Sequence, residues 1–100
     1  ILEEAGLEWV AFGHIGNNHI HINIIPRSLK EMKEGLSIYR EFAKKAVALG
    51  GTISAEHGVG KIKKEFFSIM FSDKALKEMK AVKIALDPGL MLNPGNMLDM

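Results

Sequence analysis

The sequence contains no cysteine among its 100 residues. Disulfide bonds, thiolate metal sites and a cysteine nucleophile are therefore excluded. No apolar run approaches the ~20 residues that a membrane-spanning helix needs. The lack of cysteine suits a cytoplasmic protein, and this is the location that we expect, with attachment to a membrane surface through partner subunits as the alternative.

An excess of charge of one sign is also lacking. Thirteen lysines and arginines stand against twelve acidic residues, so the net charge is 13 − 12 = +1 with neutral histidines. Nothing in this balance favours nucleic acid as a partner. Hydrophobic residues make up 47% and charged residues 25% of the chain, as in an ordinary globular domain.

The start of the chain lacks an initiator methionine. It reads Ile1-Leu2-Glu3-Glu4, an acidic segment that does not resemble a signal peptide. The length suffices for one small domain with a marginal core. We therefore expect a piece of a longer protein.

Two segments near the N-terminus have the character of β-strands. Glu8–His14 is rich in β-forming residues, and His19–Ile25 alternates strictly between apolar and polar side chains. Residues 16–18, Gly-Asn-Asn, tolerate positive φ and predict a tight hairpin turn between them. The second strand then has a core face and a nitrogen-rich face, namely Ile20, Ile22 and Ile24 against His19, His21 and Asn23.

Three helices are predicted after the hairpin. A capping-box pattern at Ser28 begins the first, of about 20 residues, and Gly50-Gly51 ends it. A loop of small residues, Thr52–Gly60, leads to a short helix, and a last helix ends at Pro88. Each helix is expected to turn one apolar face inward: Leu29, Met32, Leu36, Tyr39, Ala43 and Ala46; Ile62, Phe66, Ile69 and Met70; Leu76, Met79, Val82 and Leu86.

These elements predict an α+β fold in which an antiparallel β-hairpin packs with three helices. Two strands alone do not make a stable sheet. The hairpin is therefore expected to be part of a larger antiparallel sheet. Either upstream strands complete that sheet, or a second copy of the chain does so in a homo-oligomer.

Histidines are concentrated in the hairpin, where three of the four in the chain lie within eight positions. If the turn is a two-residue loop, His14 faces His21 with Cβ atoms about 4.5–5.5 Å apart, and both imidazoles can bind one metal ion. A catalytic zinc usually takes three protein ligands, and the best third candidate is Glu56 in its glycine-flanked loop. Zinc is the favoured ion, with iron and manganese as alternatives.

His57 follows the predicted carboxylate ligand directly. In an extended chain the two side chains point to opposite sides, so His57 can act as a general base while Glu56 binds metal. A surface histidine without a role is the alternative. A phosphate-binding loop is not indicated, because the segment from Gly58 to Lys61 lacks the required spacing.

Three segments, in this order, resemble the C-terminal domain of FAD-linked oxidases. They are Phe12–Asn23, Gly50–Gly60, and Leu86–Pro88 with Leu92–Gly95. This family includes D-lactate dehydrogenases, the flavin subunit of glycolate oxidase and D-2-hydroxyglutarate dehydrogenase. The resemblance spans nearly the whole chain. It implies that residues 1–100 are a C-terminal part of a ferredoxin-like domain, without the N-terminal FAD-binding domain.

The resemblance also implies a metal site and a base. His14 and His21 match the two histidine ligands, Glu56 matches the carboxylate ligand, and His57 matches the base that takes a proton from the substrate. The family commonly reads Gly-Asp-Gly-Asn between the two histidines. Here the acidic residue is gone, and His19 stands where asparagine is usual.

The implied activity is oxidation of a small 2-hydroxy acid to a 2-oxo acid. Asn23 matches a residue that helps to hold the substrate, and Asn93 lies in a tail that runs near the flavin in relatives. FAD, bound mainly by the absent domain, and a divalent metal are the implied cofactors, and an electron-acceptor protein or subunit is an implied partner. We expect the fragment alone to be inactive. The alternative function is a non-catalytic metal-binding or self-assembling fragment.

Overall fold

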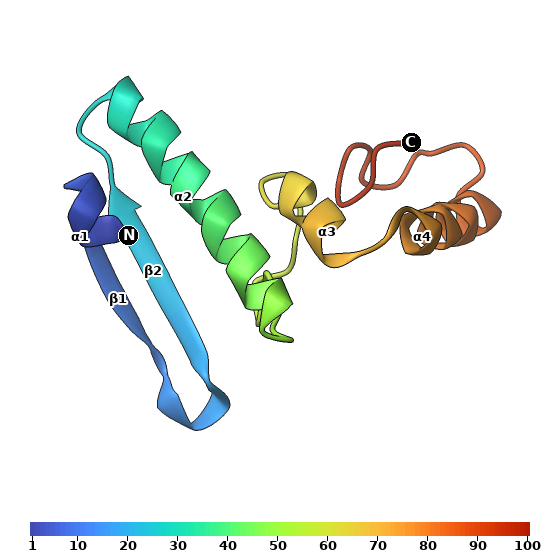
Figure 1. Ribbon diagram of the computed structural model, residues 1–100. Helices are drawn as coiled ribbons and strands as arrows, with labels where there is room; N and C mark the ends of the chain where they lie inside the picture. The colour runs from blue at the N-terminus through green and yellow to red at the C-terminus, as the bar shows by residue number, and fades with distance from the viewer. The chain divides into compact units, whose positions relative to one another are not determined.

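The computed structural model describes residues 1–100, which form two compact units, Ile1–Phe42 and Ala43–Met100. The α+β prediction is confirmed, although a short first helix was not predicted (Figure 1). None of the helices combines the length and the apolar character needed to cross a bilayer. The elements are α1 (Leu2–Ala5), β1 (Glu8–His14), β2 (His19–Ile25), α2 (Leu29–Ala48), α3 (Lys64–Met70) and α4 (Asp73–Leu86).

β1 and β2 pair as a two-stranded antiparallel sheet with the predicted bounds but another register. His14 lies opposite His19, and Phe12 lies opposite His21. The prediction that His14 faces His21 was wrong, because the loop has four residues: a 3₁₀ turn at Ile15–Asn17 and Asn18 at φ 50°. The observed pairing of β1 with β2 is shifted by two residues from the predicted pairing. Since side chains alternate with a period of two, every residue stays on its predicted face.

The core of the first unit lies between the hairpin, α1 and the first part of α2. Leu2, Leu7 and Ile38 are buried at its centre. Figure 1 shows α2 running alongside β2, and Ile22 and Ile24 pack against the same cluster. The isoleucine face is therefore the core face, as predicted, except at Ile20, which is 64% exposed near the turn.

The buried face of α2 matches the predicted one only in part. Ala43 is buried and Tyr39 and Ala46 are half-buried, as predicted. Leu29, Met32 and Leu36 are exposed, whereas Ile38 is 6% exposed. The helix approaches the sheet at Gly35, where an added Cβ would lie 3.3 Å from Ile24 Cγ2. This close approach fixes the rotation of α2 and turns the Ile38 side towards the hairpin.

Both ends of α2 follow the sequence signals. At the N-terminus the Glu31 amide donates to Ser28 Oγ at 3.2 Å, and Glu31 Oε2 accepts from the Arg27 amide at 2.5 Å. At the C-terminus Gly50 adopts φ 80°, and the Gly51 amide donates to the Ala46 carbonyl at 2.8 Å. The latter is a Schellman motif, which requires positive φ at the position that Gly50 occupies.

The second unit contains α3, α4 and the C-terminal tail. Phe67 is its most buried apolar side chain, and its ring lies 4.7 Å from that of Phe71. The predicted inward positions Ile62, Val82 and Leu86 are 89%, 60% and 82% exposed, so these predictions were wrong. Ile62 precedes α3 and lies in a turn. The other two are uncovered because so small a unit buries little surface.

Candidate metal and catalytic residues

Three histidines gather on one face of the hairpin. The pairing places His14, His19 and His21 on the same side of the sheet. The ring centroids are 5.4 Å apart for His14–His19, 4.4 Å for His19–His21 and 6.1 Å for His14–His21. One ring nitrogen of each lies within 4.8 Å of the others. The predicted pair is therefore brought together, with His19 as a third member.

Phe12 supports this cluster from the neighbouring strand. It is the cross-strand partner of His21, and the two rings stack with centroids 5.0 Å apart and planes inclined by 19°. An aromatic ring stacked on an imidazole restricts the orientation of that imidazole. No role was predicted for Phe12 from the sequence. Its even spacing from His14 within the predicted strand was the signal that both lie on one face.

Asn23 continues the same face beyond His21. It pairs with Val10, and its side chain is exposed. Two residues along a strand bring a side chain to the next position on one face. An amide here can donate to and accept from a ligand that is held by the histidines.

Glu56 and His57 lie in the second unit, in the loop between α2 and α3. Their side chains contact each other, with His57 Nε2 3.2 Å from Glu56 Oε1. The expectation that they point to opposite sides was wrong, because the loop bends here and is not extended. A carboxylate in contact with one ring nitrogen can fix the orientation of an imidazole.

Ser54 organises this loop. Its hydroxyl donates to the Gly58 carbonyl at 2.9 Å and accepts from Lys63 Nζ at 3.1 Å. The Thr52 hydroxyl donates to the Ser54 carbonyl at 3.2 Å. The bond from residue 54 to residue 58 closes a small turn whose tip carries Glu56 and His57. No role was predicted for Ser54 from the sequence, because hydrogen bonds within a loop leave no periodic pattern.

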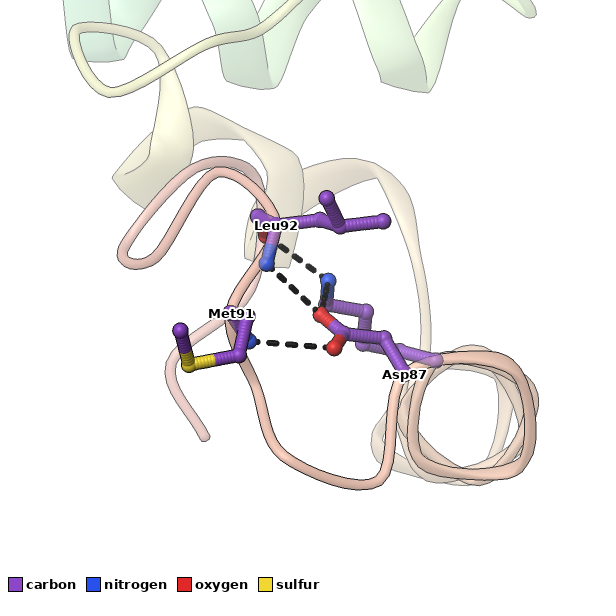
Figure 2. Close-up of polar contacts among 4 residues, drawn as sticks. Asp87, Met91 and Leu92 are labelled. Atoms are coloured by element: carbon purple, nitrogen blue, oxygen red, sulfur yellow. Dashed lines mark hydrogen bonds and ion pairs between the residues drawn. The ribbon is translucent and has the colours of Figure 1, made fainter.

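Asp87 anchors the C-terminal tail, as Figure 2 shows. Its side chain is 8% exposed and accepts from the Met91 amide at 3.0 Å and the Leu92 amide at 2.9 Å. Lys83 Nζ forms an ion pair with Asp87 and also donates to the Leu92 carbonyl at 2.7 Å. The hydrogen bond from Lys83, followed by those from the two amides, lowers the pKa of Asp87 to about 2.

Asn93 follows this anchored segment. It has φ 45° and an exposed side chain, and its carbonyl accepts from the Asn96 amide at 3.2 Å. The Met97 amide donates to the Gly60 carbonyl at 3.0 Å, which ties the tail to the end of the Glu56–His57 loop. The tail therefore has a fixed path within the second unit, and Asn93 lies on it.

The chemistry of the histidine cluster fits a divalent transition metal. Neutral imidazoles are good ligands for zinc, iron, nickel and copper, and catalytic zinc sites commonly use two or three of them. Three ring nitrogens on the two-stranded sheet could provide the first ligands of such an ion. His14 is exposed and the other two are half-buried, so an ion bound there would be accessible to water or substrate.

The chain belongs to the family of FAD linked oxidases, C-terminal domain, whose model matches residues 1–97. It is 39% identical over 88 residues to the glycolate oxidase subunit GlcD of Bacillus subtilis, across 86% of this chain and 19% of that protein. It is 33% identical over 102 residues to a D-lactate dehydrogenase of Archaeoglobus fulgidus, across 98% and 22%. A D-2-hydroxyglutarate dehydrogenase of Stutzerimonas stutzeri is 35% identical over 92 residues, across 88% and 20%. The chain thus spans about a fifth of the length of these relatives.

Proposed function

We propose that this chain is the C-terminal catalytic part of a flavin-dependent dehydrogenase that oxidises a 2-hydroxy acid to a 2-oxo acid. The observation that carries the proposal is the gathering of His14 and His21 on one hairpin face, within 6.1 Å between ring centroids. Membership of the FAD-linked oxidase family and the names of the similar relatives support the reaction class.

Separate residues of the chain bind the metal, the substrate and the flavin. His14 and His21 hold a divalent metal, with Glu56 as the carboxylate ligand that the family resemblance implies. When bound, the metal supplies Lewis-acid polarisation of a substrate oxygen, and FAD supplies the hydride acceptor. Asn23 donates a hydrogen bond to the substrate beside the histidines. Asn93 lies on the tail segment that we assign to contact with the flavin.

His57 takes the proton. Oxidation of a 2-hydroxy acid removes one proton from the hydroxyl and one hydride from the α-carbon, and it leaves a 2-oxo acid. An imidazole accepts a proton near neutral pH. Glu56 Oε1 lies 3.2 Å from His57 Nε2, and a carboxylate in this position can fix the orientation of the imidazole.

The partners proposed for the enzyme are a small 2-hydroxy acid and an electron-acceptor protein or subunit. A cytoplasmic location stays a prediction from the absence of cysteine. The division into an absent N-terminal FAD-binding domain and the present C-terminal part stays a prediction from the family resemblance. Inactivity of the isolated chain follows from this division, because FAD binding is assigned to the absent part.

A second candidate function, self-assembly without catalysis, is favoured by the exposure of β1. All seven residues of the strand are exposed, including Trp9 (37%), Val10 (46%) and Phe12 (55%). A strand of this kind at a sheet edge invites pairing with another strand. Light scattering of the purified chain tests this function, since it requires a stable oligomer whose material shows no flavin absorbance.

The proposed function is tested on the longer protein that contains this chain. Glycolate, D-lactate and D-2-hydroxyglutarate are added anaerobically, and the flavin absorbance is followed. At least one acid should bleach the oxidised flavin, and 1-propanol, which lacks the carboxylate, should not. Bleaching by none of the acids would contradict the proposal.

A further inference from the structure

We propose that the hairpin holds its metal ion through three imidazoles, with His19 as a ligand beside His14 and His21. This inference rests on the proposed function, because it concerns the same metal site. It adds a ligand that the family resemblance does not assign, since asparagine is usual at this position. The consequence is a site that retains three ligands when Glu56 is removed.

The first support is the position of the His19 ring close to both other rings. Its centroid lies 5.4 Å from that of His14 and 4.4 Å from that of His21. The centroids of His14 and His21 are 6.1 Å apart, so the three rings form a compact triangle. An ion held by His14 and His21 therefore lies within reach of His19. The strand pairing fixes this order, because His19 is the direct partner of His14.

The second support is the spacing of the donor atoms. Two nitrogens bound to a tetrahedral zinc at 2.0–2.1 Å lie about 3.3 Å from each other. One ring nitrogen of each of His14, His19 and His21 already lies within 4.8 Å of the others. The terminal torsion of histidine is broad and adjusts easily. Side-chain rotation alone can therefore close the remaining gap, without movement of the strands.

The third support is access. His19 is half-buried, so part of its side chain is open to solvent. An ion can therefore reach His19 from solvent. His14 is exposed, so a coordination position for water or substrate stays available.

A third imidazole changes which metal the site prefers. Nitrogen ligands suit zinc, nickel and copper, whereas carboxylate and water suit manganese and magnesium. Two histidines with one carboxylate are compatible with manganese or iron. With His19 added, we expect a stronger preference for Zn²⁺ over Mn²⁺ than the family's ligand set would give.

The test measures Zn²⁺ and Mn²⁺ affinity of the 100-residue chain by competition with a chromophoric chelator. The variants are His19→Asn, Glu56→Gln and His21→Asn, with Glu78→Gln, at an exposed position of α4, as the control outside the site. Circular dichroism confirms that each variant is folded. We expect His19→Asn to weaken Zn²⁺ by at least tenfold, because removal of an outer-shell partner alone costs roughly 10–100-fold. Mn²⁺ affinity should fall less, and Glu56→Gln should still bind Zn²⁺ tightly.

Long-range ¹H–¹⁵N spectra of the imidazoles give an independent readout. One equivalent of Zn²⁺ should shift the ring ¹⁵N resonances of His14, His19 and His21 most strongly. If His19→Asn binds Zn²⁺ as the wild type does while His21→Asn does not, the inference is overturned and the metal site of the proposed function stands. If His21→Asn also binds Zn²⁺ as the wild type does, both the three-imidazole inference and the metal site of the proposed function are overturned. A wild-type chain that binds no Zn²⁺ at micromolar concentration overturns the claim that the hairpin ligands suffice.

Discussion

Gly13 passes so close to the opposite strand that a Cβ on it would lie 2.1 Å from the carbonyl oxygen of His19. Backbone atoms at this distance cannot yield as a flexible side chain can. The close approach lies one residue before His14, at the end of β1. The absence of a side chain at position 13 therefore lets the two strands carry His14 and His19 as direct partners.

Gly13→Ala should therefore destabilise the hairpin. Overpacking typically costs about 1–3 kcal/mol, and here the clash is with backbone. Urea unfolding followed by circular dichroism measures the free energy of unfolding. Gly16→Ala is the matched control, because a Cβ on Gly16 would meet nothing within 4 Å. Equal unfolding midpoints for the two variants would contradict this reading of the strand contact.

The strands were predictable in extent but not in register. The alternation in His19–Ile25 and the turn residues before it set the strand bounds. The register depends on whether the turn contains two or four residues. It contains four, because Asn18 adopts the left-handed conformation after the 3₁₀ turn. The shared face of His14 and His21 survived this error, because a two-residue slip preserves side-chain parity.

The helix ends were also predictable, whereas the buried face of α2 was predictable only in the second half of the helix. Capping at Ser28 and the glycine stop at Gly50 act locally, so the sequence alone specifies them. The rotation of α2 depends on the contact of Gly35 with Ile24, which is a tertiary contact. The Glu56–His57 contact was missed for a similar reason, since Ser54 bends the loop through hydrogen bonds that no periodic pattern reveals.

Tyr39→Phe should lower the free energy of unfolding by about 0.5–1.5 kcal/mol. The Tyr39 hydroxyl donates to the Ile22 carbonyl, which links α2 to β2. The substitution removes only this oxygen and leaves the carbonyl without that donor. Chemical denaturation measures the change. An unfolding midpoint equal to that of the wild type would show that the link between α2 and β2 adds no stability.

Asp87 should make the second unit sensitive to acid. Its pKa is lowered from 3.8 to about 2 in the folded chain, first by the hydrogen bond from Lys83. A depressed carboxyl pKa contributes stability that is present above the unfolded value and is lost as pH falls through the folded one. The loss attributable to Asp87 therefore falls between about pH 4 and pH 2.

Asp87→Asn should flatten the pH dependence of the unfolding temperature in this range and speed hydrogen exchange of the Met91 and Leu92 amides. Asp73→Asn is the control, since Asp73 lies in the exposed first turn of α4. If the two variants showed the same acid profile and the same exchange rates, Asp87 would not be the anchor of the tail.

His57→Gln, placed in the longer protein, should reduce kcat by roughly 10²–10⁴-fold if His57 is the base. The KM for the 2-hydroxy acid should change far less, and flavin and metal content should stay at wild-type levels. Turnover that stays close to wild type would remove His57 from the mechanism.

Metal content tests the central claim most directly, namely that the histidine face of the hairpin is a metal site. Elemental analysis is made on the purified chain and on His21→Ala. The account predicts close to one divalent transition metal ion per chain, lost in the variant while its circular dichroism spectrum is kept. An equal metal content in the two proteins, or none in either, would contradict it.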